Sequence, residues 1–217
     1  MNTRQSGAGF IVIDGVDGAG KGVQSRLLFD AMQAQGLEVI LSREPGGSPG
    51  AEEIRRLIVA GDVEKWDSLT ELLLIYAARR SHLVDTIWPA LSAGKWVISD
   101  RFADSSRAFQ GVAGDVGLEQ VELVHHLVVG SFKPDLTLIL DLDPAISLRR
   151  AQQRGGHEDR FEKKGLSYQE KVRGAFRMLA LKSPQTHALI DASETVEQVQ
   201  ARIFDEIKKR LGIELNR

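Results

Sequence analysis

A glycine-rich segment limits the possible folds of this chain more than any other feature. It joins a short apolar run to an amphipathic one. Residues 10–13 (FIVI) are apolar and mostly β-branched, which is typical of a buried strand. The segment GVDGAGK follows at residues 15–21, and apolar residues then recur at helical spacing over residues 21–35. Glycines at this spacing, between a strand and a helix, predict a phosphate-binding loop, because backbone amides, the helix N-terminus and Lys21 converge on phosphate oxygens. A glycine-rich turn without a ligand is the alternative, and the flanking strand and helix argue against it.

The order of strand then helix continues along the chain. Further strands are predicted at residues 37–41, 96–99, 136–142 and 188–190, and helices at 51–60, 68–93, 105–132, from 144, at 168–181 and at 196–211. Strands that alternate with helices form a mainly parallel sheet covered on both faces. We therefore expect an α/β protein with a three-layer P-loop fold, a central parallel five-stranded sheet and a short lid. A length of 217 residues suits one well-filled core, so residues 1–217 are expected to form a single domain.

The composition narrows the classes of protein further. Charged residues make up 27% of the chain and the formal net charge is −2, so we expect no binding to polymeric nucleic acid or to an acidic membrane. The sequence contains no cysteine, which excludes disulfides, thiolate metal ligands and thiol catalysis. No apolar run is long enough to span a membrane, and residues 1–9 lack the apolar stretch of a signal peptide. We therefore expect a cytoplasmic protein.

A pair of opposite charges follows the predicted strand at residues 96–99. Asp100 and Arg101 would lie at the carboxyl edge of the sheet, where open α/β sheets bind ligands. An aspartate there can hold magnesium or its waters, and an arginine can bind a phosphate through two hydrogen bonds. A surface ion pair at a strand end is the alternative interpretation.

The residues after Lys21 depart from the usual phosphate-binding loop. Gly22 and Val23 stand where a serine or threonine hydroxyl commonly helps to hold magnesium. We therefore predict that magnesium is held by phosphates, by water and by the carboxylates of Asp17 and Asp100, since Mg²⁺ keeps several waters in most protein sites.

Three further motifs resemble those of bacterial thymidylate kinases, which are P-loop nucleoside monophosphate kinases. In the family's order and spacing they are REPGGS at residues 43–48, Arg79 within LLLIYAARR at residues 72–80, and DRFADSSRAFQG at residues 100–111. The resemblance extends over residues 10 to about 211. It implies phosphorylation of dTMP to dTDP with ATP and Mg²⁺ by direct in-line transfer, without a covalent intermediate. It also implies a homodimer, formed through long apolar helices such as the one predicted at residues 68–93.

The resemblance implies roles for individual residues as well, with the acceptor bound by residues from about 43 to 111. Arg43 and Arg101 would bracket the dTMP phosphate, and Arg79 would face the edge of the thymine. Phe109 would lie beneath the deoxyribose. The other residues implied to touch dTMP are Asp17, Ile75, Ser105, Ser106 and Gln110. The residues implied to hold ATP form the phosphate-binding loop: Gly15, Val16, Asp17, Gly18, Ala19, Gly20, Lys21 and Gly22.

A charged, glycine-containing segment at residues 149–163 resembles the lid of this family. The family carries a catalytic arginine in either the phosphate-binding loop or the lid, and Gly18 stands where the loop would carry it. The resemblance therefore assigns that role to Arg154 or Arg160, which would stabilise the transferring phosphoryl group when the lid closes. A solvated charged loop is the alternative. The other catalytic residues implied are Lys21 and Arg101.

Ile75 departs from the family, which usually has at this position a phenylalanine that stacks on thymine. A kinase for another nucleotide, such as dUMP or AMP, is therefore an alternative, although the motif at residues 43–48 argues against AMP. The missing hydroxyl at Gly22 also leaves open a sensor that binds nucleotides without turnover.

Two other groups of polar residues are not predicted to take part in the chemistry. His82, His125 and His126 have no metal-ligand spacing, so we expect them at surface or packing positions. Asp141 and Asp143 are predicted to form a turn and the start of the next helix.

Overall fold

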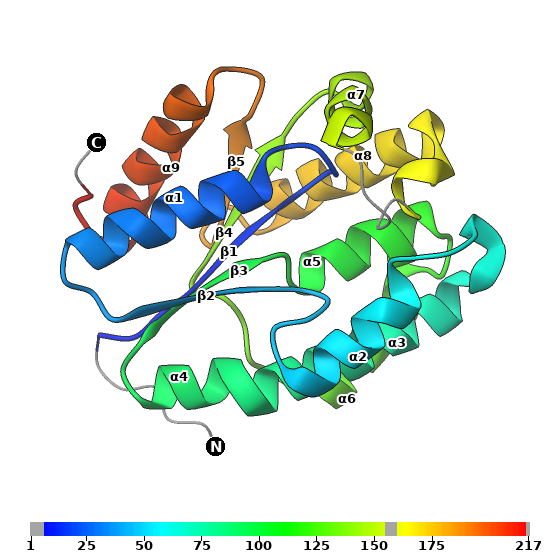
Figure 1. The fold of residues 1–217 in the computed structure, drawn as a ribbon, viewed down its shortest axis with the longest axis horizontal. Helices are drawn as coiled ribbons and strands as arrows, with labels where there is room; N and C mark the ends of the chain where they lie inside the picture. The colour runs from blue at the N-terminus through cyan, green and yellow to red at the C-terminus, as the bar shows by residue number, and fades with distance from the viewer. Residues whose placement is uncertain (1–6, 155–159, 216–217) are drawn as a thin grey trace.

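The predicted five-stranded parallel sheet is confirmed. The computed structural model describes residues 7–154 and 160–215, and the strand order in its sheet is β2-β3-β1-β4-β5, with every neighbouring pair parallel (Figure 1). The strands are β1 (Phe10–Gly15), β2 (Val39–Arg43), β3 (Trp96–Asp100), β4 (Leu136–Asp141) and β5 (His187–Asp191). The order changes direction at β1, so the loops after β1 and β3 open at the same edge of the sheet, as is usual for ligand sites in this architecture.

Helices cover both faces of the sheet, which makes the fold three-layered. The α-helices are α1 (Lys21–Ala34), α2 (Pro49–Ile58), α3 (Ser68–His82), α4 (Trp88–Ser92), α5 (Ala103–Ser106), α6 (Leu118–Val128), α7 (Pro144–Arg154), α8 (Leu166–Lys182) and α9 (Val196–Leu211). The shorter helical segments are η1 (Val63–Lys65), η2 (Leu83–Ile87), η3 (Arg107–Ala113) and η4 (Glu162–Lys164). None of the helices in the described part of the chain is long and apolar enough to cross a membrane.

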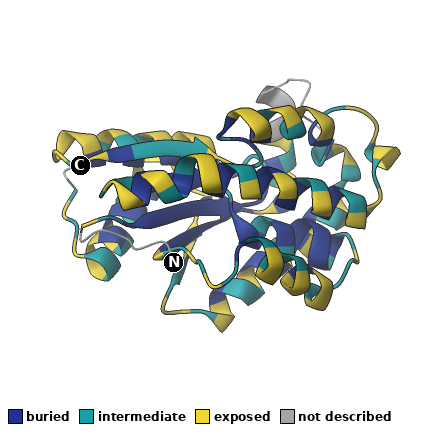
Figure 2. Ribbon diagram, turned by 90° about the horizontal axis from the view of Figure 1, so that it is seen from below, coloured by how far each residue is buried: buried dark blue, intermediate teal, exposed yellow. Residues whose placement is uncertain are grey.

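The residues of strand β1 are nearly all apolar and do not alternate with polar ones, and the structure gives the reason. All six residues of the strand are buried, because successive side chains point to opposite faces and both faces are covered. Ile11 and Ile13 belong to the core under α1 and α9, whereas Phe10 and Val12 belong to the core under α3 and α4. Figure 2 shows the buried strands between helices whose outer faces are exposed.

One predicted long helix is interrupted in the structure, and one predicted helical region divides into two parts. The helix expected at residues 68–93 passes through a π-helical turn, η2, just before Pro89, whose ring nitrogen has no N–H for the regular ladder of hydrogen bonds. The region expected to hold helices, residues 105–132, contains two separate helical parts. Its first part ends at Ala113, and α6 starts at Leu118 after a break that contains Gly117 at φ 92°. On either side of the break, η3 packs mainly against α8, whereas α6 packs against α3.

Candidate active site

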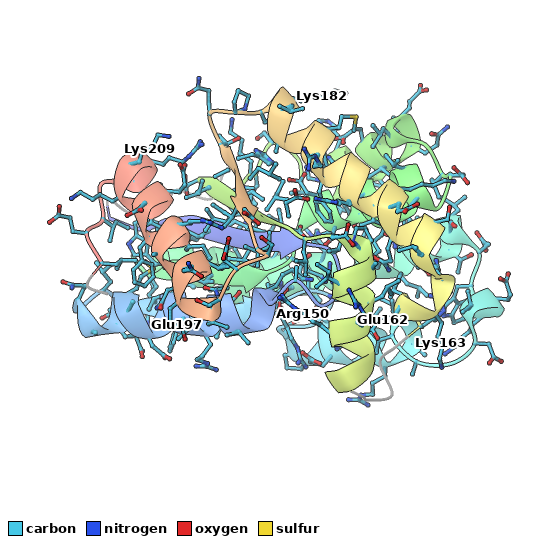
Figure 3. The ribbon with its side chains drawn as sticks, turned by 90° about the horizontal axis from the view of Figure 1, so that it is seen from above. Arg150, Glu162, Lys163, Lys182, Glu197 and Lys209 are labelled. Carbon is cyan, nitrogen blue, oxygen red and sulfur yellow. The ribbon has the colours of Figure 1, made fainter. Side chains whose placement is uncertain are left out.

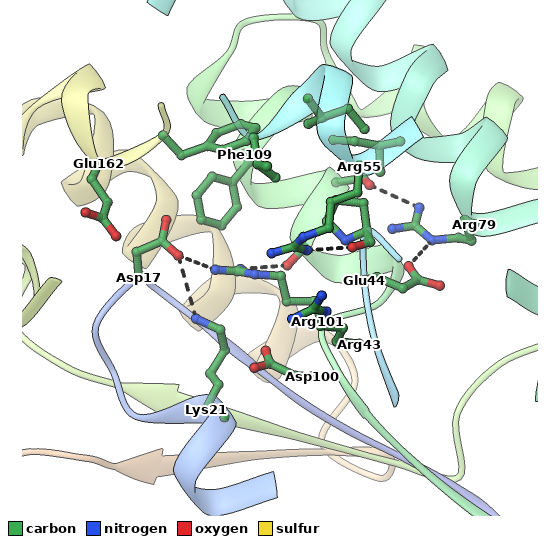
Figure 4. Close-up of a pocket in the computed structure, with 18 of the residues that line it drawn as sticks. Asp17, Lys21, Arg43, Glu44, Arg55, Arg79, Asp100, Arg101, Phe109 and Glu162 are labelled. Carbon is green, nitrogen blue, oxygen red and sulfur yellow. Dashed lines mark hydrogen bonds and ion pairs between the residues drawn. The ribbon is translucent and has the colours of Figure 1, made fainter. Parts of the chain in front are cut away.

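A cavity of about 710 Å³ opens at the carboxyl ends of β1, β2 and β3 (Figure 4). It is lined by the phosphate-binding loop, by the segment after β2, by α2 and α3, and by the segment from Asp100 to Gln110. The residues of the sequence-based prediction that line it are Asp17, Gly18, Gly20, Lys21, Gly22, Arg43, Ile75, Arg79, Asp100, Arg101, Ser105, Ser106, Phe109 and Gln110. The structure therefore brings residues from four separate sequence motifs to one cavity.

The phosphate-binding loop turns sharply between β1 and α1. Gly15 has φ 133°, and a Cβ atom there would lie 2.5 Å from the backbone oxygen of Leu140, so only glycine fits. Lys21 starts α1, and its Nζ donates a hydrogen bond of 2.8 Å to the Val16 carbonyl at the head of the same loop. Burial, with Arg101 nearby, lowers the pKa of Lys21 to about 8. The ammonium group is thus held among the groups that would receive phosphates.

Arg101 is held across the cavity floor by the loop and by α5. Its Nη1 donates to the Gly15 carbonyl at 3.3 Å and to Ser105 Oγ at 3.0 Å, and its Nη2 forms an ion pair with Asp17. The guanidinium also lies 5.1 Å from the centre of the Phe109 ring. Its backbone is left-handed, with φ 73°, an uncommon conformation for a residue other than glycine that is often found at functional sites.

Asp14 is a buried carboxylate that the sequence-based prediction missed. It accepts hydrogen bonds from the backbone N–H groups of Gly15, at 2.9 Å, and Ser105, at 3.1 Å, and from Ser105 Oγ at 2.7 Å. Burial raises its pKa to about 6, against the opposing effect of Arg101 at 3.7 Å. Asp14 therefore joins the phosphate-binding loop to the start of α5. The only signal in the sequence was its place as the one charged residue at the end of an apolar strand.

Asp100 fits the predicted role of a magnesium ligand or of an acceptor for the ion's waters. Its Oδ1 is buried and has no hydrogen-bond partner among the described residues. A Cβ atom added to Gly22 would meet only Asp100 Oδ2, at 3.5 Å, so there is space beside the carboxylate. Within residues 7–154 and 160–215, no three His, Cys, Asp or Glu side chains gather as a metal-binding group. The donor set therefore suits an ion bound mainly by phosphates and water.

Arg79 is fixed at the opposite end of the cavity. It is 1% exposed, and it donates from Nε to Glu44 at 2.7 Å, from Nη1 to Ser106 Oγ at 3.0 Å and from Nη2 to the Phe102 carbonyl at 2.9 Å. Its guanidinium lies over the ring of Tyr76, 4.4 Å from the ring centre. These contacts use three of the five N–H donors of an arginine. Among the residues that the structure describes, the other two donors have no protein acceptor and can serve a ligand.

His82 was predicted at a surface or packing position. The structure places it inside a buried polar network. Its Nδ1 lies 3.0 Å from Glu44 and its Nε2 lies 2.6 Å from Ser42 Oγ, and the side chain is fully buried. Burial alone would raise the pKa of Glu44, but Arg79 and His82 bring it below its ordinary value. The network ties α3 to the segment after β2.

Ile75 lies in a small apolar cluster that the sequence did not reveal. Ile58 and Val59 from the end of α2 pack with it, and Phe161 packs against the same cluster. All four line the cavity. The apolar surface next to Arg79 is therefore built from three segments, and Phe161 gives it an aromatic side chain although residue 75 does not.

Arg160 does not lie where a mobile catalytic arginine would be expected. It is fully buried and outside the cavity lining, its Nη1 pairs with Glu71, and its Nε and Nη2 donate to backbone carbonyls of the segment before α3. This is the arrangement of a structural anchor, and it gives no support to a catalytic role. Arg154 ends α7, which packs against η4 and α8 and carries Arg150 (Figure 3). The side chain of Arg154 and residues 155–159 of the expected lid lie outside the described part of the structure.

Asp141, the last residue of β4, and Asp143, just after the strand, differ in role. Asp143 accepts a hydrogen bond of 2.9 Å from the backbone N–H of Ala145, as predicted for a residue that starts α7. Asp141 instead binds two arginines of α8, with Arg173 Nε at 2.6 Å and Arg177 Nη1 at 2.9 Å. It therefore fastens α8 to the end of β4.

A phosphate-binding loop at the switch point of a parallel sheet, with an arginine and an aspartate at the end of the adjacent strand, defines a P-loop nucleotide kinase. The family model for thymidylate kinase matches residues 13–203. The thymidylate kinases of Ruegeria pomeroyi and Caulobacter vibrioides are each 46% identical to the chain, over 95% and 94% of it and 98% of each relative. The crystal structure of thymidylate kinase from Ehrlichia chaffeensis superimposes with a TM-score of 0.77 at 30% identity, covering 93% of this chain and 100% of that one. The chain therefore belongs to the thymidylate kinase family.

Proposed function

We propose that the protein transfers the γ-phosphoryl group of ATP to the phosphate of dTMP, yielding ADP and dTDP. The observation that carries the proposal is one cavity that extends from the phosphate-binding loop to the polar side chains of Arg79 and Gln110. One end suits a triphosphate and the other suits a base, with Arg101 between them. The names and the nearly full coverage of the relatives support dTMP as the acceptor.

The arrangement of charges suits direct transfer. An acceptor phosphate is already anionic at neutral pH, so the reaction needs positioning and neutralisation of charge more than a strong base. Lys21 and Arg101 supply positive charge near the phosphate-binding loop. Arg43 and Arg55 line the cavity on the side of the acceptor, and Arg55 is held by a 2.5 Å hydrogen bond to the Pro45 carbonyl. We assign Arg43 to the acceptor phosphate, and Arg55, which the sequence-based prediction missed, to the same group.

Magnesium is part of the proposal. Bound to the phosphates of ATP, it would neutralise charge that develops during transfer. Asp100 would hold it or its waters, because one oxygen of that buried carboxylate has no partner in the described structure. Asp17 would contribute from the phosphate-binding loop. Arg154 is the proposed lid arginine.

We also propose a homodimer in the cytoplasm, where ATP and deoxynucleotides are found. Helices α3 and α6 pack side by side, and each presents two exposed leucines one turn apart. Leu69 and Leu73 are 48% and 52% exposed, and Leu123 and Leu127 are 68% and 85% exposed. Exposed apolar side chains on adjacent helices favour an interface. Analytical ultracentrifugation of the protein and of Leu127→Asp tests this, because the variant should sediment as a monomer.

The deciding experiment measures ADP formation from ATP and Mg²⁺ with dTMP, dUMP, AMP and dCMP offered separately. Turnover with dTMP well above the other three supports the proposal and shows that Ile75 suffices beneath thymine. Turnover with a different acceptor would keep the fold and the chemistry and replace the substrate. If no acceptor is phosphorylated although ATP binds, the sensor alternative becomes the better account.

A further inference from the structure

Two hydrogen-bonded pairs join α3 to the wall of the cavity formed by α5 and η3. Glu71, Ile75 and Arg79 recur every four residues, so they follow one face of α3. Ser106 and Gln110 have the same spacing on the opposite wall. Arg79 Nη1 donates to Ser106 Oγ at 3.0 Å, and Gln110 Nε2 donates to Glu71 Oε1 at 2.7 Å. Arg79, shown in Figure 4, and Gln110 therefore stand at the two ends of a short row, with Ile75 between them.

The orientation of the Gln110 amide follows from its partner. A carboxylate has no hydrogen to donate, so the amide must turn its Nε2 group to Glu71 and its Oε1 away. Gln110 is 1% exposed and lines the cavity, and its Oε1 is buried without a hydrogen-bond partner among the residues described. A buried acceptor without a donor is costly unless a ligand supplies the donor. Gln110 thus offers an acceptor to whatever base occupies the cavity.

Glu71 is itself fixed as an acceptor by two cations. Its side chain is fully buried, Arg160 Nη1 pairs with Oε2, and Lys164 Nζ lies 3.4 Å from the same oxygen. Arginine and lysine side chains carry donors and no acceptor, so both place the Glu71 oxygens in the accepting role. Arg160 is held in turn by the carbonyls of Asp62 and Val63, at 3.0 Å and 2.9 Å. Arg160 and Gln110 therefore both donate to Glu71, and no other arrangement of donors and acceptors satisfies these three side chains.

We propose that Glu71 is a positioning residue that fixes Gln110 as an acceptor and thereby makes the cavity select bases with an imide edge. Thymine and uracil present an acceptor, O4, next to a donor, N3–H, which matches a free Arg79 donor next to Gln110 Oε1. Cytosine and adenine present an amino donor next to a ring nitrogen acceptor, which is the reverse pattern. The inference rests on the proposed function and explains how it would exclude dCMP and AMP without help from residue 75.

The first test is Glu71→Gln. The new amide keeps a carbonyl oxygen for Arg160, so its NH₂ group faces Gln110, whose own amide must turn over and direct Nε2 into the cavity. We expect the ratio of kcat/KM for dTMP to kcat/KM for dCMP to fall about tenfold or more, mainly through the two KM values, as expected for one reversed hydrogen bond. An unchanged ratio in a folded variant overturns the proposal.

Two further variants guard against a merely structural effect. Lys164→Met removes a cation from Glu71 but leaves the carboxylate an acceptor only, so the dTMP to dCMP ratio should stay as in the unmodified protein. If Lys164→Met lowers the ratio as much as Glu71→Gln does, the effect does not come from the direction of the Gln110 amide, and the proposal is overturned. If Glu71→Gln fails to fold, Gln110→Met decides, because it keeps the Glu71–Arg160 pair. It should raise the KM for dTMP about tenfold without changing that for dCMP, and an unaltered ratio overturns the inference.

The same measurements separate this inference from the proposed function. If the unmodified protein phosphorylates dTMP but Glu71→Gln keeps its base preference, only the role of Glu71 falls. If the unmodified protein phosphorylates dCMP or AMP better than dTMP and dUMP, the proposed function falls and the inference falls with it.

Discussion

Arg79 and Glu44 form an ion pair of 2.7 Å between Nε and Oε2, with side chains only 1% and 2% exposed. Arg79 lies on α3 and Glu44 follows β2, so the pair joins these two segments at the end of the cavity that we propose to hold the base. Removing one partner of a buried pair leaves the other charge without compensation, which commonly costs 3–5 kcal/mol, and Glu44→Gln should therefore lower the free energy of unfolding by about 3 kcal/mol at pH 7.

The effect of Glu44→Gln should depend on pH in one direction. Because the pKa of Glu44 is below its ordinary value of 4.5 in the folded protein, its contribution to stability is complete above that value and is lost as the pH falls through the folded pKa. Urea unfolding at pH 7 and at pH 4 should therefore show a smaller difference between variant and unmodified protein at the lower pH. Glu38→Gln is the control, because its pair with Lys95 is exposed and should contribute less than about 0.5 kcal/mol.

Arg101→Ala should abolish turnover and leave ATP binding near normal. Arg101 contacts the phosphate-binding loop and Ser105, and we propose that it stabilises the transferring phosphoryl group. Removal of an arginine in that role costs about 10³-fold or more in kcat. Steady-state kinetics and calorimetric titration with ATP test the two parts separately. Arg177→Ala is a suitable control, since Arg177 binds Asp141 away from the cavity lining. Loss of ATP affinity in Arg101→Ala with little loss of kcat would mean that the donor and acceptor ends are inverted.

ATP binding should weaken as the pH rises above about 8. Burial, with Arg101 nearby, lowers the pKa of Lys21 to about 8, so at higher pH the free protein loses the cation that phosphates require. Calorimetric affinities from pH 7 to pH 9.5 should show a decline that is absent in Lys21→Arg, whose guanidinium stays charged. Parallel curves for the two proteins would contradict this role. Lys21→Ala should cripple transfer at every pH.

Gly22→Ser should lower the concentration of Mg²⁺ needed for nucleotide binding. A side chain at this position would meet only Asp100 Oδ2, at 3.5 Å for the Cβ atom, and a hydroxyl beside that carboxylate is the oxygen that most phosphate-binding loops supply. The measurement is the Mg²⁺ dependence of ATP affinity. Gly22→Ala is the matched control, because it adds the Cβ without the oxygen. The same Mg²⁺ dependence in both variants would show that the hydroxyl has no access to the ion.

The order of strands and helices, and the phosphate-binding loop, could be predicted because they depend on residues close together in the sequence. The apolar run at residues 10–13 and the glycines that follow specify a strand, a turn and a helix start over a few positions. The interruption of the helix predicted at residues 68–93 was missed because one π-helical turn barely changes an apolar period of 3.6 residues.

The partners of the polar residues could not be predicted, because they come from distant parts of the chain. Asp14 accepts from Ser105, 91 residues away, and Arg160 pairs with Glu71, 89 residues away. A charged segment that closes over a ligand and one that anchors the fold look alike in sequence. Only the contacts of Arg160 with Glu71 and with the segment before α3 show that it is a buried anchor.

The sequence by itself thus determined the class of fold, the family and most of the residues that line the cavity, since each lies in a local motif with its own backbone requirements. Tertiary structure alone decided how those side chains are oriented. The direction of the Gln110 amide, the network around Glu44 and the aromatic side chain of Phe161 beside Ile75 all depend on which groups meet in a buried space. In such a space every donor needs an acceptor, so the meeting of distant segments sets the chemistry that the local motifs only make available.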